Sequence, residues 1–246
     1  MTIQKAVVIV CWIIIWQLVA VLVHNDILFV GPAETVRALV RLAATDTFLK
    51  AVFSSYGRIL AGFCIGVVSG ILLAVASYVN KVAQAFIAPF VHLSKTVPVA
   101  CFVVILLIMA GTSHTALIVS AIVALPVLYN GVYGGLKNAD REEIEIADMF
   151  TMTRLDRVRH IFLPAVYPFL LAALKLASGV SFKAGIAAEV IAQTCGSLGN
   201  GLYKAKVLLQ TDVLFAITVV VVALSFITEK AVVFIFRKWG KKYDYE

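Results

Sequence analysis

The chain has 246 residues, of which 62% are hydrophobic and only 14% are Asp, Glu, Lys or Arg, with a net charge of +7. Ordinary globular domains carry about 25% charged residues, so this composition excludes a soluble fold of the same length. It indicates an all-α polytopic membrane protein. Because the basic residues cluster beside apolar runs, membrane lipid rather than nucleic acid is the expected partner of the positive charge.

Apolar runs of roughly 20 residues, the length that crosses a bilayer, recur along the chain. We expect six spans, at residues 6–23, 59–79, 86–110, 115–136, 165–191 and 213–236. The first run ends without a small-residue cleavage site, so we expect it to persist as a span. Pro89, Pro98 and Pro126 lie inside spans and predict kinks.

Two features precede the third span. Pro32 stands where a helix would begin, and apolar residues follow it at helical spacing, so we expect a short amphipathic helix at the membrane interface. Gly62, Gly66 and Gly70 stand four residues apart in the second span, a pattern that lets another helix approach closely. Packing within one subunit is the favoured interpretation, and a seam between two subunits is the alternative.

The densest charge lies between Lys137 and Pro164, where six acidic and five basic residues occur. Apolar residues recur at helical spacing on both sides of Thr151: Ile146, Met149 and Phe150 before it, and Leu155, Val158 and Phe162 after it.

The segment after Thr151 carries signals for both ends of a second helix. Thr153 and Asp156 form a capping pair, and Pro164 is expected to end that helix. The pattern therefore predicts helix, turn, helix outside the membrane. A plain solvated connector is the alternative, although a connector needs no apolar face of this size. Lys and Arg are more frequent on the side that holds this block and both termini, which places all three in the cytoplasm.

Charged residues also occur within the fifth span. Lys175 and Lys183 should face protein or a watery cavity, because an uncompensated lysine is costly in lipid. We interpret them as part of a translocation pathway for an anion, the alternatives being pairing with Glu189 or with carbonyls, and snorkelling. Glu189 lies near the outer end of this span, where it either pairs locally or contributes to a gate. The glycine-rich residues 195–201 are expected to form a turn or a re-entrant break.

Catalytic and metal-binding motifs are not found in the sequence. The cysteines and histidines are scattered, with no CxxC and no His/Cys cluster, so no metal site is expected. There is no GxxxxGK[ST] phosphate loop and no nucleophile–base constellation, so we expect neither ATP binding by this chain nor an enzyme.

The charged block resembles the cytoplasmic loop of ABC importer permeases, which reads Glu-Ala-Ala, three residues, Gly, nine residues, Ile-x-Leu-Pro. Here Glu145-Ile146-Ala147 is followed at that spacing by Thr151 and by Ile161-Phe162-Leu163-Pro164. The stretches YGRILAGFCIGVVSGILLA, TVPVACFVVILLIMAG and SFKAGIAAEVIA extend the likeness to the nitrate, sulfonate and taurine branch. Thr151 replaces the family's Gly, and β-branched residues tolerate positive φ poorly, which leaves the geometry of the turn open.

The resemblance implies a type I ABC importer permease fold, in one domain over residues 1–246, with residues 137–164 as the cytoplasmic coupling loop between spans four and five. It further implies a permease homodimer in a bacterial inner membrane, an extracytoplasmic solute-binding protein, and cytoplasmic ATPase subunits that hold ATP and Mg²⁺. The permease itself would bind no cofactor.

In such a transporter the loop helix sits in a cleft of the ATPase. The coupling residues implied are Glu145, Ala147, Asp148, Met149, Phe150, Thr151, Leu163 and Pro164. Met149 and Phe150 would supply apolar anchors, and Glu145 and Asp148 charged contacts. The expected solute is a small anion or zwitterion, such as a sulfonate, nitrate, taurine or a vitamin precursor. A secondary transporter or channel without an ATPase is the alternative, but it would need ion-relaying carboxylates, which are few in these spans.

Overall fold

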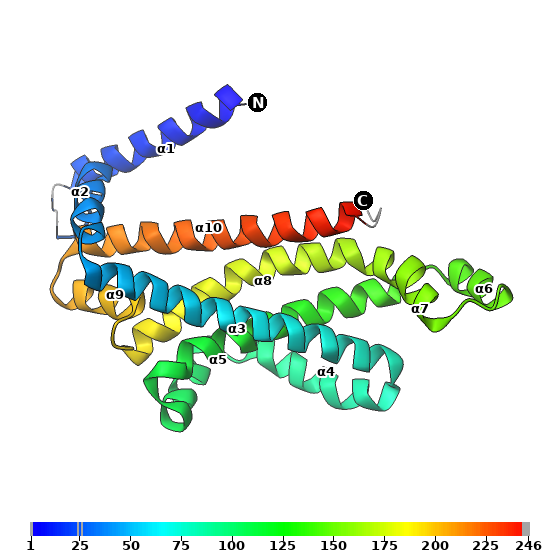
Figure 1. Ribbon diagram of the computed structural model, residues 1–246. Helices are drawn as coiled ribbons and strands as arrows, with labels where there is room; N and C mark the ends of the chain where they lie inside the picture. Colours follow the sequence, from blue (N-terminus) through cyan, green and yellow to red (C-terminus); the bar gives the residue numbers. More distant parts are fainter. Residues whose placement is uncertain (1, 24, 26, 243–246) are drawn as a thin grey trace.

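The computed structural model describes residues 2–23, 25 and 27–242, and the regular secondary structure of these residues is entirely helical. In chain order the helices are α1 (Thr2–Val23), α2 (Pro32–Ala43), α3 (Asp46–Val79), α4 (Lys81–Thr96), α5 (Val99–Lys137), α6 (Arg141–Met149), α7 (Arg154–Arg157), the π-helical η1 (Val158–Phe162), α8 (Leu163–Ala192), α9 (Leu198–Val207) and α10 (Thr211–Lys242). Figure 1 shows α3, α5, α8 and α10 running lengthwise, with α2 and α9 at one end and α6 and α7 at the other.

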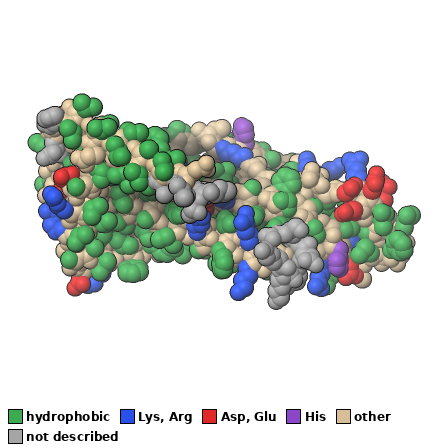
Figure 2. All heavy atoms as spheres, turned by 90° about the horizontal axis from the view of Figure 1, so that it is seen from above, with side chains coloured by type: hydrophobic (Ala, Val, Ile, Leu, Met, Phe, Trp, Pro, Cys, Tyr) green, Lys and Arg blue, Asp and Glu red, His purple; other side chains and the backbone are tan. Residues whose placement is uncertain are grey.

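Four helical stretches are long and apolar enough to cross a membrane: Asp46–Val79, Val99–Lys137, Arg154–Ala192 and Thr211–Gly240. They contain the second, fourth, fifth and sixth predicted spans. The first predicted span lies in α1, whose apolar stretch is shorter, and residues 24 and 26 after it lie outside the described residues. In Figure 2 the visible acidic side chains gather mainly at the two ends of the molecule, as expected for a protein with an apolar middle.

The predicted third span is wrong as a single continuous helix. Val97 is extended at φ −72° and ψ 127°, and it separates α4 from α5. The cause is Pro98, which lacks an N–H and pushes the preceding residue out of helical geometry. A second break follows at Gly111, whose φ of 70° divides α5 close to the predicted boundary between the third and fourth spans.

The prediction that Pro164 ends the second loop helix is also wrong. Leu163, just before it, is helical at φ −65° and ψ −45°, and its N–H donates to the carbonyl of Val158. This bond spans five residues, so the backbone widens into the π-helical turn η1. The wider turn gives room for a proline ring that would clash with the carbonyl four residues earlier. The chain is therefore helical without interruption from Arg154 to Ala192.

The glycine-rich residues 195–201 form a turn only in their first part, and α9 begins inside them. Ser197 caps this helix by accepting from the N–H of Asn200 at 2.9 Å. Gly199 is needed because a Cβ there would collide with the side chain of Glu189 on α8. Gly199 thus permits close packing of two helices, and the predicted turn covers only the first residues of the segment.

The predicted close approach along Gly62, Gly66 and Gly70 is confirmed, and the partner is α5 of the same chain. A Cβ at Gly66 would lie 2.6 Å from the Cβ of Ala124, and one at Gly70 would lie 2.8 Å from the carbonyl oxygen of Leu125. The amphipathic helix is confirmed as α2, with Pro32 in its first turn. Together α3, α5 and α8 form the packed centre, and α10 joins them along α8.

Candidate functional site

The charged loop between α5 and α8 begins with a well-capped helix. The side chain of Asp140 accepts a hydrogen bond from the N–H of Glu142 at 2.9 Å, which fixes the first turn of α6. Glu142 and Glu143 follow in that turn, where carboxylates oppose the positive end of the helix dipole. The cap and the two carboxylates explain why a mainly charged segment forms a helix outside the apolar part of the chain.

The turn after α6 keeps a left-handed residue at Thr151, where the family pattern has Gly. Thr151 has φ 49°. Its N–H donates to the carbonyl of Asp148 at 3.2 Å, and the N–H of Met152 donates to that of Ala147 at 3.0 Å. This pair of bonds is the Schellman motif, which closes a helix on its last carbonyls. The turn therefore forms despite a β-branched residue in an unfavourable region.

Arg157 braces the same turn from the other side. Its guanidinium forms an ion pair with Asp148 at 2.5 Å, and its Nε donates to the carbonyl of Met152 at 3.2 Å. A further, longer bond of 3.5 Å reaches the carbonyl of Ala147. The predicted capping pair at the start of α7 is confirmed, because the Thr153 side chain accepts a hydrogen bond from the N–H of Asp156. Sequence reasoning missed Arg157, although a base in the first turn of the second helix can face the carbonyl end of the first.

A small core holds the loop together and leaves one apolar face exposed. Ala147 is fully buried and packs with Ala139 and Ile161. By contrast, Met149 and Phe150 expose 76% and 75% of their surface. A pair of exposed large apolar side chains on a braced turn is a feature of interaction surfaces.

The residues predicted for coupling do not all share this face. Glu145 and Asp148 are exposed beside Met149 and Phe150, although Asp148 is already paired with Arg157. Leu163 and Pro164 lie half-buried at the start of α8. The structure thus gathers the predicted acids and anchors on α6 and its turn, and it places the two residues of the Leu-Pro pair in the stem of the loop.

At the opposite end of the molecule, Glu189 is fully enclosed in a polar network. Its carboxylate accepts from the hydroxyl of Ser55 at 2.6 Å and forms an ion pair with Arg58 at 2.9 Å. The N–H of Gly199 also donates to it, at 3.2 Å. A buried carboxylate needs this many partners to offset the loss of water. The network ties α3, α8 and the beginning of α9 together.

The two lysines of the fifth predicted span lie outside this network. Lys175 approaches Glu229 of α10 at 3.7 Å, with 64% of its side chain exposed. Lys183 is exposed on α8, and within the described part of the chain no hydrogen bond or ion pair reaches it. Neither lysine pairs with Glu189, so that alternative is wrong.

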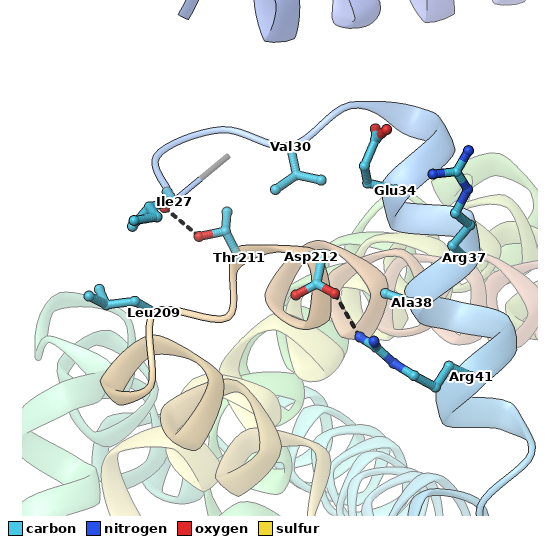
Figure 3. A pocket seen from close by; sticks show the side chains of 9 residues that line it. All are labelled: Ile27, Val30, Glu34, Arg37, Ala38, Arg41, Leu209, Thr211 and Asp212. Atoms are coloured by element: carbon cyan, nitrogen blue, oxygen red, sulfur yellow. Dashed lines mark hydrogen bonds and ion pairs between the residues drawn. The ribbon is translucent and has the colours of Figure 1, made fainter. Parts of the chain in front are cut away.

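A polar pocket of about 560 Å³ lies between α2 and the beginning of α10, at the end of the molecule that carries α9. Figure 3 shows Arg41 and Asp212 pointing toward each other across it, and their ion pair measures 2.7 Å. Thr211 donates to the carbonyl of Ile27 beside them. These contacts fix α2 against α10. Among the described residues there is no group of three or more His, Cys, Asp or Glu that could hold a metal ion.

Comparison with known proteins gives a consistent result. The sequence model of the family described as "binding-protein-dependent transport system inner membrane component" matches residues 66–241. The chain is 27% identical over 223 residues to the taurine transport system permease protein TauC of Escherichia coli, covering 87% of this chain and 80% of TauC. It is 21% identical over 237 residues to the putative aliphatic sulfonates transport permease protein SsuC of Bacillus subtilis, covering 94% and 86%. The nitrate import permease protein NrtB of Leptolyngbya laminosa is 27% identical over 154 residues, 62% of this chain and 54% of NrtB.

Solved structures share the fold. The MetNI methionine ABC transporter, in inward-facing conformations, contains a chain that matches with a TM-score of 0.63 at 20% identity, over 77% of this chain and 94% of that one. An amino acid ABC transporter with histidines matches with a TM-score of 0.62 at 16% identity, over 83% and 97%.

Proposed function

Because this chain belongs to the family of binding-protein-dependent transport system inner membrane components, we propose that its α6–α7 loop is where a partner ATPase drives the transport cycle. As a member of that family the chain is the multi-pass inner-membrane permease subunit of an ABC importer, and such subunits are not catalytic. Family membership implies two kinds of partner, an ATPase and a solute-binding protein.

The observation that carries this proposal is the exposed pair Met149 and Phe150 on a turn that is braced by Arg157. Side chains this exposed make few contacts in the free permease that docking would break. Burying them against a partner is therefore favourable, as it is for anchors at interfaces. Glu145 and Asp148 border them and supply charge for orientation. Since α7, η1 and α8 form one continuous helix, displacement of the loop would move α8 as well.

The test is co-purification of the ATPase with detergent-solubilised permease. We expect Glu145→Lys combined with Phe150→Ala to abolish both co-purification and uptake while the permease stays folded. Phe53→Ala is a matched control, because Phe53 is an aromatic residue exposed to 73% at the other end of the molecule. Unchanged co-purification and uptake in the double variant would contradict the proposal, and a secondary transporter or channel would then be the better hypothesis.

We place six crossings in the membrane: α1, α3, α4 with the first part of α5, the second part of α5, α8 and α10. Figure 1 supports this, since α1 begins and α10 ends on the side away from α2, toward the α6–α7 loop. Both termini and residues 137–164 would then be cytoplasmic, and residues 1–246 would form one permease domain. Family likeness also favours a homodimer, which chemical cross-linking in membranes would test.

The proposed solute is a small anion or zwitterion. Taurine, aliphatic sulfonates and nitrate are the solutes in the names of the similar permeases, and all three carry a negative group. Lys183 supports this choice, because an exposed lysine in the middle of a spanning helix is tolerated where it faces water or an anion. Lys175 lies in the cleft between α8 and α10, so we base the pathway proposal on Lys183. Glu189 is fully enclosed, so we assign it a role in holding the outer ends of the helices together.

The solute class can be tested on the solute-binding protein that serves this permease. A thermal-shift screen with sulfonates, nitrate, amino acids and vitamin precursors should raise its melting temperature with an anionic or zwitterionic ligand. A response to cations alone would contradict the proposal. In uptake assays, Lys183→Gln should lower transport of that ligand more than Lys204→Gln, which removes an exposed lysine from α9.

A further inference from the structure

A basic cleft lies between α8 and α10, in the half of the molecule that carries the α6–α7 loop. Its volume is about 740 Å³, within the range of pockets that bind small ligands. Lys175 enters from α8, and Glu229, Lys230 and Arg237 enter from α10. Three bases against one acid leave the cleft with surplus positive charge.

The charges in the cleft are only loosely satisfied. The ion pair between Lys175 and Glu229 is long, at 3.7 Å, and both side chains are partly exposed. Lys230 lies 5.1 Å from the ring centroid of Phe226, a cation–π contact that leaves its hydrogen-bond donors available. Within the described residues no hydrogen bond or ion pair reaches Arg237. A cleft in this condition favours an anion with several oxygens.

The surroundings of the cleft match a lipid. Lys230 and Arg237 are seven residues apart on one face of α10, about 10 Å along the axis, with Arg237 nearer the end of the helix. Ile227 and Phe234 lie on the neighbouring strip, and they expose 57% and 68% of their surface. A phospholipid can lay an acyl chain on the apolar strip while its phosphate reaches the bases. Basic pockets between spanning helices bind acidic headgroups in this way.

We infer that the cleft formed by Lys175, Lys230 and Arg237 is a binding site for a phosphate oxyanion, supplied by the headgroup of an anionic phospholipid. Glu229 holds Lys175 when the site is empty and is the group that the phosphate displaces. This site is separate from the α6–α7 turn and does not depend on docking of an ATPase. It lies where a bound lipid would connect α8, which continues the loop, to α10.

The experiment measures thermal unfolding of the full-length permease, purified in neutral detergent and supplemented in three ways. Phosphatidylglycerol supplies the anionic headgroup, phosphatidylcholine with the same acyl chains lacks its net charge, and inorganic phosphate at constant ionic strength supplies the free anion. We expect phosphatidylglycerol to raise the melting temperature at low mole fraction, and phosphatidylcholine to have little effect. If phosphate alone gives the same shift, the cleft binds a phosphate oxyanion, but its ligand is the free anion and not the lipid headgroup.

Variants distinguish a site from general attraction to charged lipid. Lys230→Gln combined with Arg237→Gln should raise the half-saturating fraction of phosphatidylglycerol roughly thirtyfold. Lys204→Gln combined with Lys206→Gln removes the same charge from exposed positions on α9 and should leave it unchanged. Glu229→Gln should lower the half-saturating fraction of phosphatidylglycerol, because the carboxylate that competes with the phosphate is lost. Equal responses to the two lipids, or equal half-saturation in the cleft and α9 variants, would overturn the inference.

Discussion

Two arginine–carboxylate pairs, one at each end of the molecule, place the same chemical groups in opposite environments. Arg58 and Glu189 lie in the packed region between α3 and α8, where the carboxylate is fully buried. Arg157 and Asp148 lie in the α6–α7 loop, where 61% of the Asp148 side chain is exposed. The first pair joins helices that are far apart in the sequence, whereas the second holds a local turn in shape. The buried pair therefore holds packed helices together, whereas the pair in the loop fixes the shape of an exposed turn.

Breaking the buried pair should have the largest effect. Arg58→Met leaves the Glu189 carboxylate buried without its counter-ion, which should lower the free energy of unfolding by about 3–5 kcal/mol. Thermal or denaturant unfolding of the purified permease measures this. Adding Glu189→Gln should recover much of the loss, because the uncompensated charge is then gone. A full loss in the double variant would show that packing, and not charge, holds this end together.

Truncation at the other end should affect binding and leave folding unchanged. Phe150→Ala should weaken ATPase association by about 1–2 kcal/mol, a factor of roughly ten, since apolar anchors dominate interfaces. The unfolding free energy should change by less than about 0.5 kcal/mol, as for other exposed positions. Titration of the ATPase onto permease in nanodiscs gives the first quantity, and unfolding gives the second. A variant that is destabilised and still binds normally would reverse the comparison.

Backbone strain at positive φ can be tested with two substitutions that should change the free energy of unfolding in opposite directions. Thr151→Gly should stabilise the permease by about 1 kcal/mol, because a β-branched residue at positive φ is strained and the gain exceeds the added freedom of the unfolded chain. Gly196 has φ 66° and no atom within 4 Å of where its Cβ would stand, so Gly196→Thr tests φ alone. It should destabilise by about 1–2 kcal/mol. Shifts of the same sign in unfolding experiments would refute this explanation.

The smallest effect is expected from the ion pair between Arg157 and Asp148 in the loop. A double-mutant cycle with Arg157→Gln and Asp148→Asn should give a coupling energy of about 0.5 kcal/mol, because water and salt screen the charges. The cycle on Arg41 and Asp212, whose side chains are 67% and 34% exposed, should give a similar value. Unfolding in low and high salt supplies the measurement. A coupling near that of the buried pair would mean that the loop is far less hydrated than its exposure indicates.

The sequence was most informative where local rules decide the structure. Hydropathy located the long spans, and the proline of α2 and the Thr153 cap marked helix starts correctly. The spacing of Gly62, Gly66 and Gly70 indicated a close helix contact, and packing alone determined that α5 is the partner. The apolar residues of the loop were also predicted, because an amphipathic face is visible in the order of residues.

The errors arose where distant parts of the chain decide the outcome. Glu189 and Arg58 are 131 positions apart, and no local pattern connects them. The π-turn before Pro164 depends on backbone adjustment that a rule about proline alone does not capture. Likewise, the sequence pattern predicts a turn or a break over residues 195–201, because the contact of Gly199 with Glu189 exists only in three dimensions. At Thr151 the hydrogen bonds of the turn override the preference of the residue.

The uninterrupted helix from Arg154 to Ala192 can move as one rigid body. Its 39 residues span about 58 Å, roughly twice the thickness of the bilayer's hydrocarbon layer. A tilt of roughly 10° would swing one tip by about 10 Å relative to the other, without bending the rod. Even a small tilt of this helix would therefore shift its two ends strongly relative to each other, and Pro164 does not interrupt it.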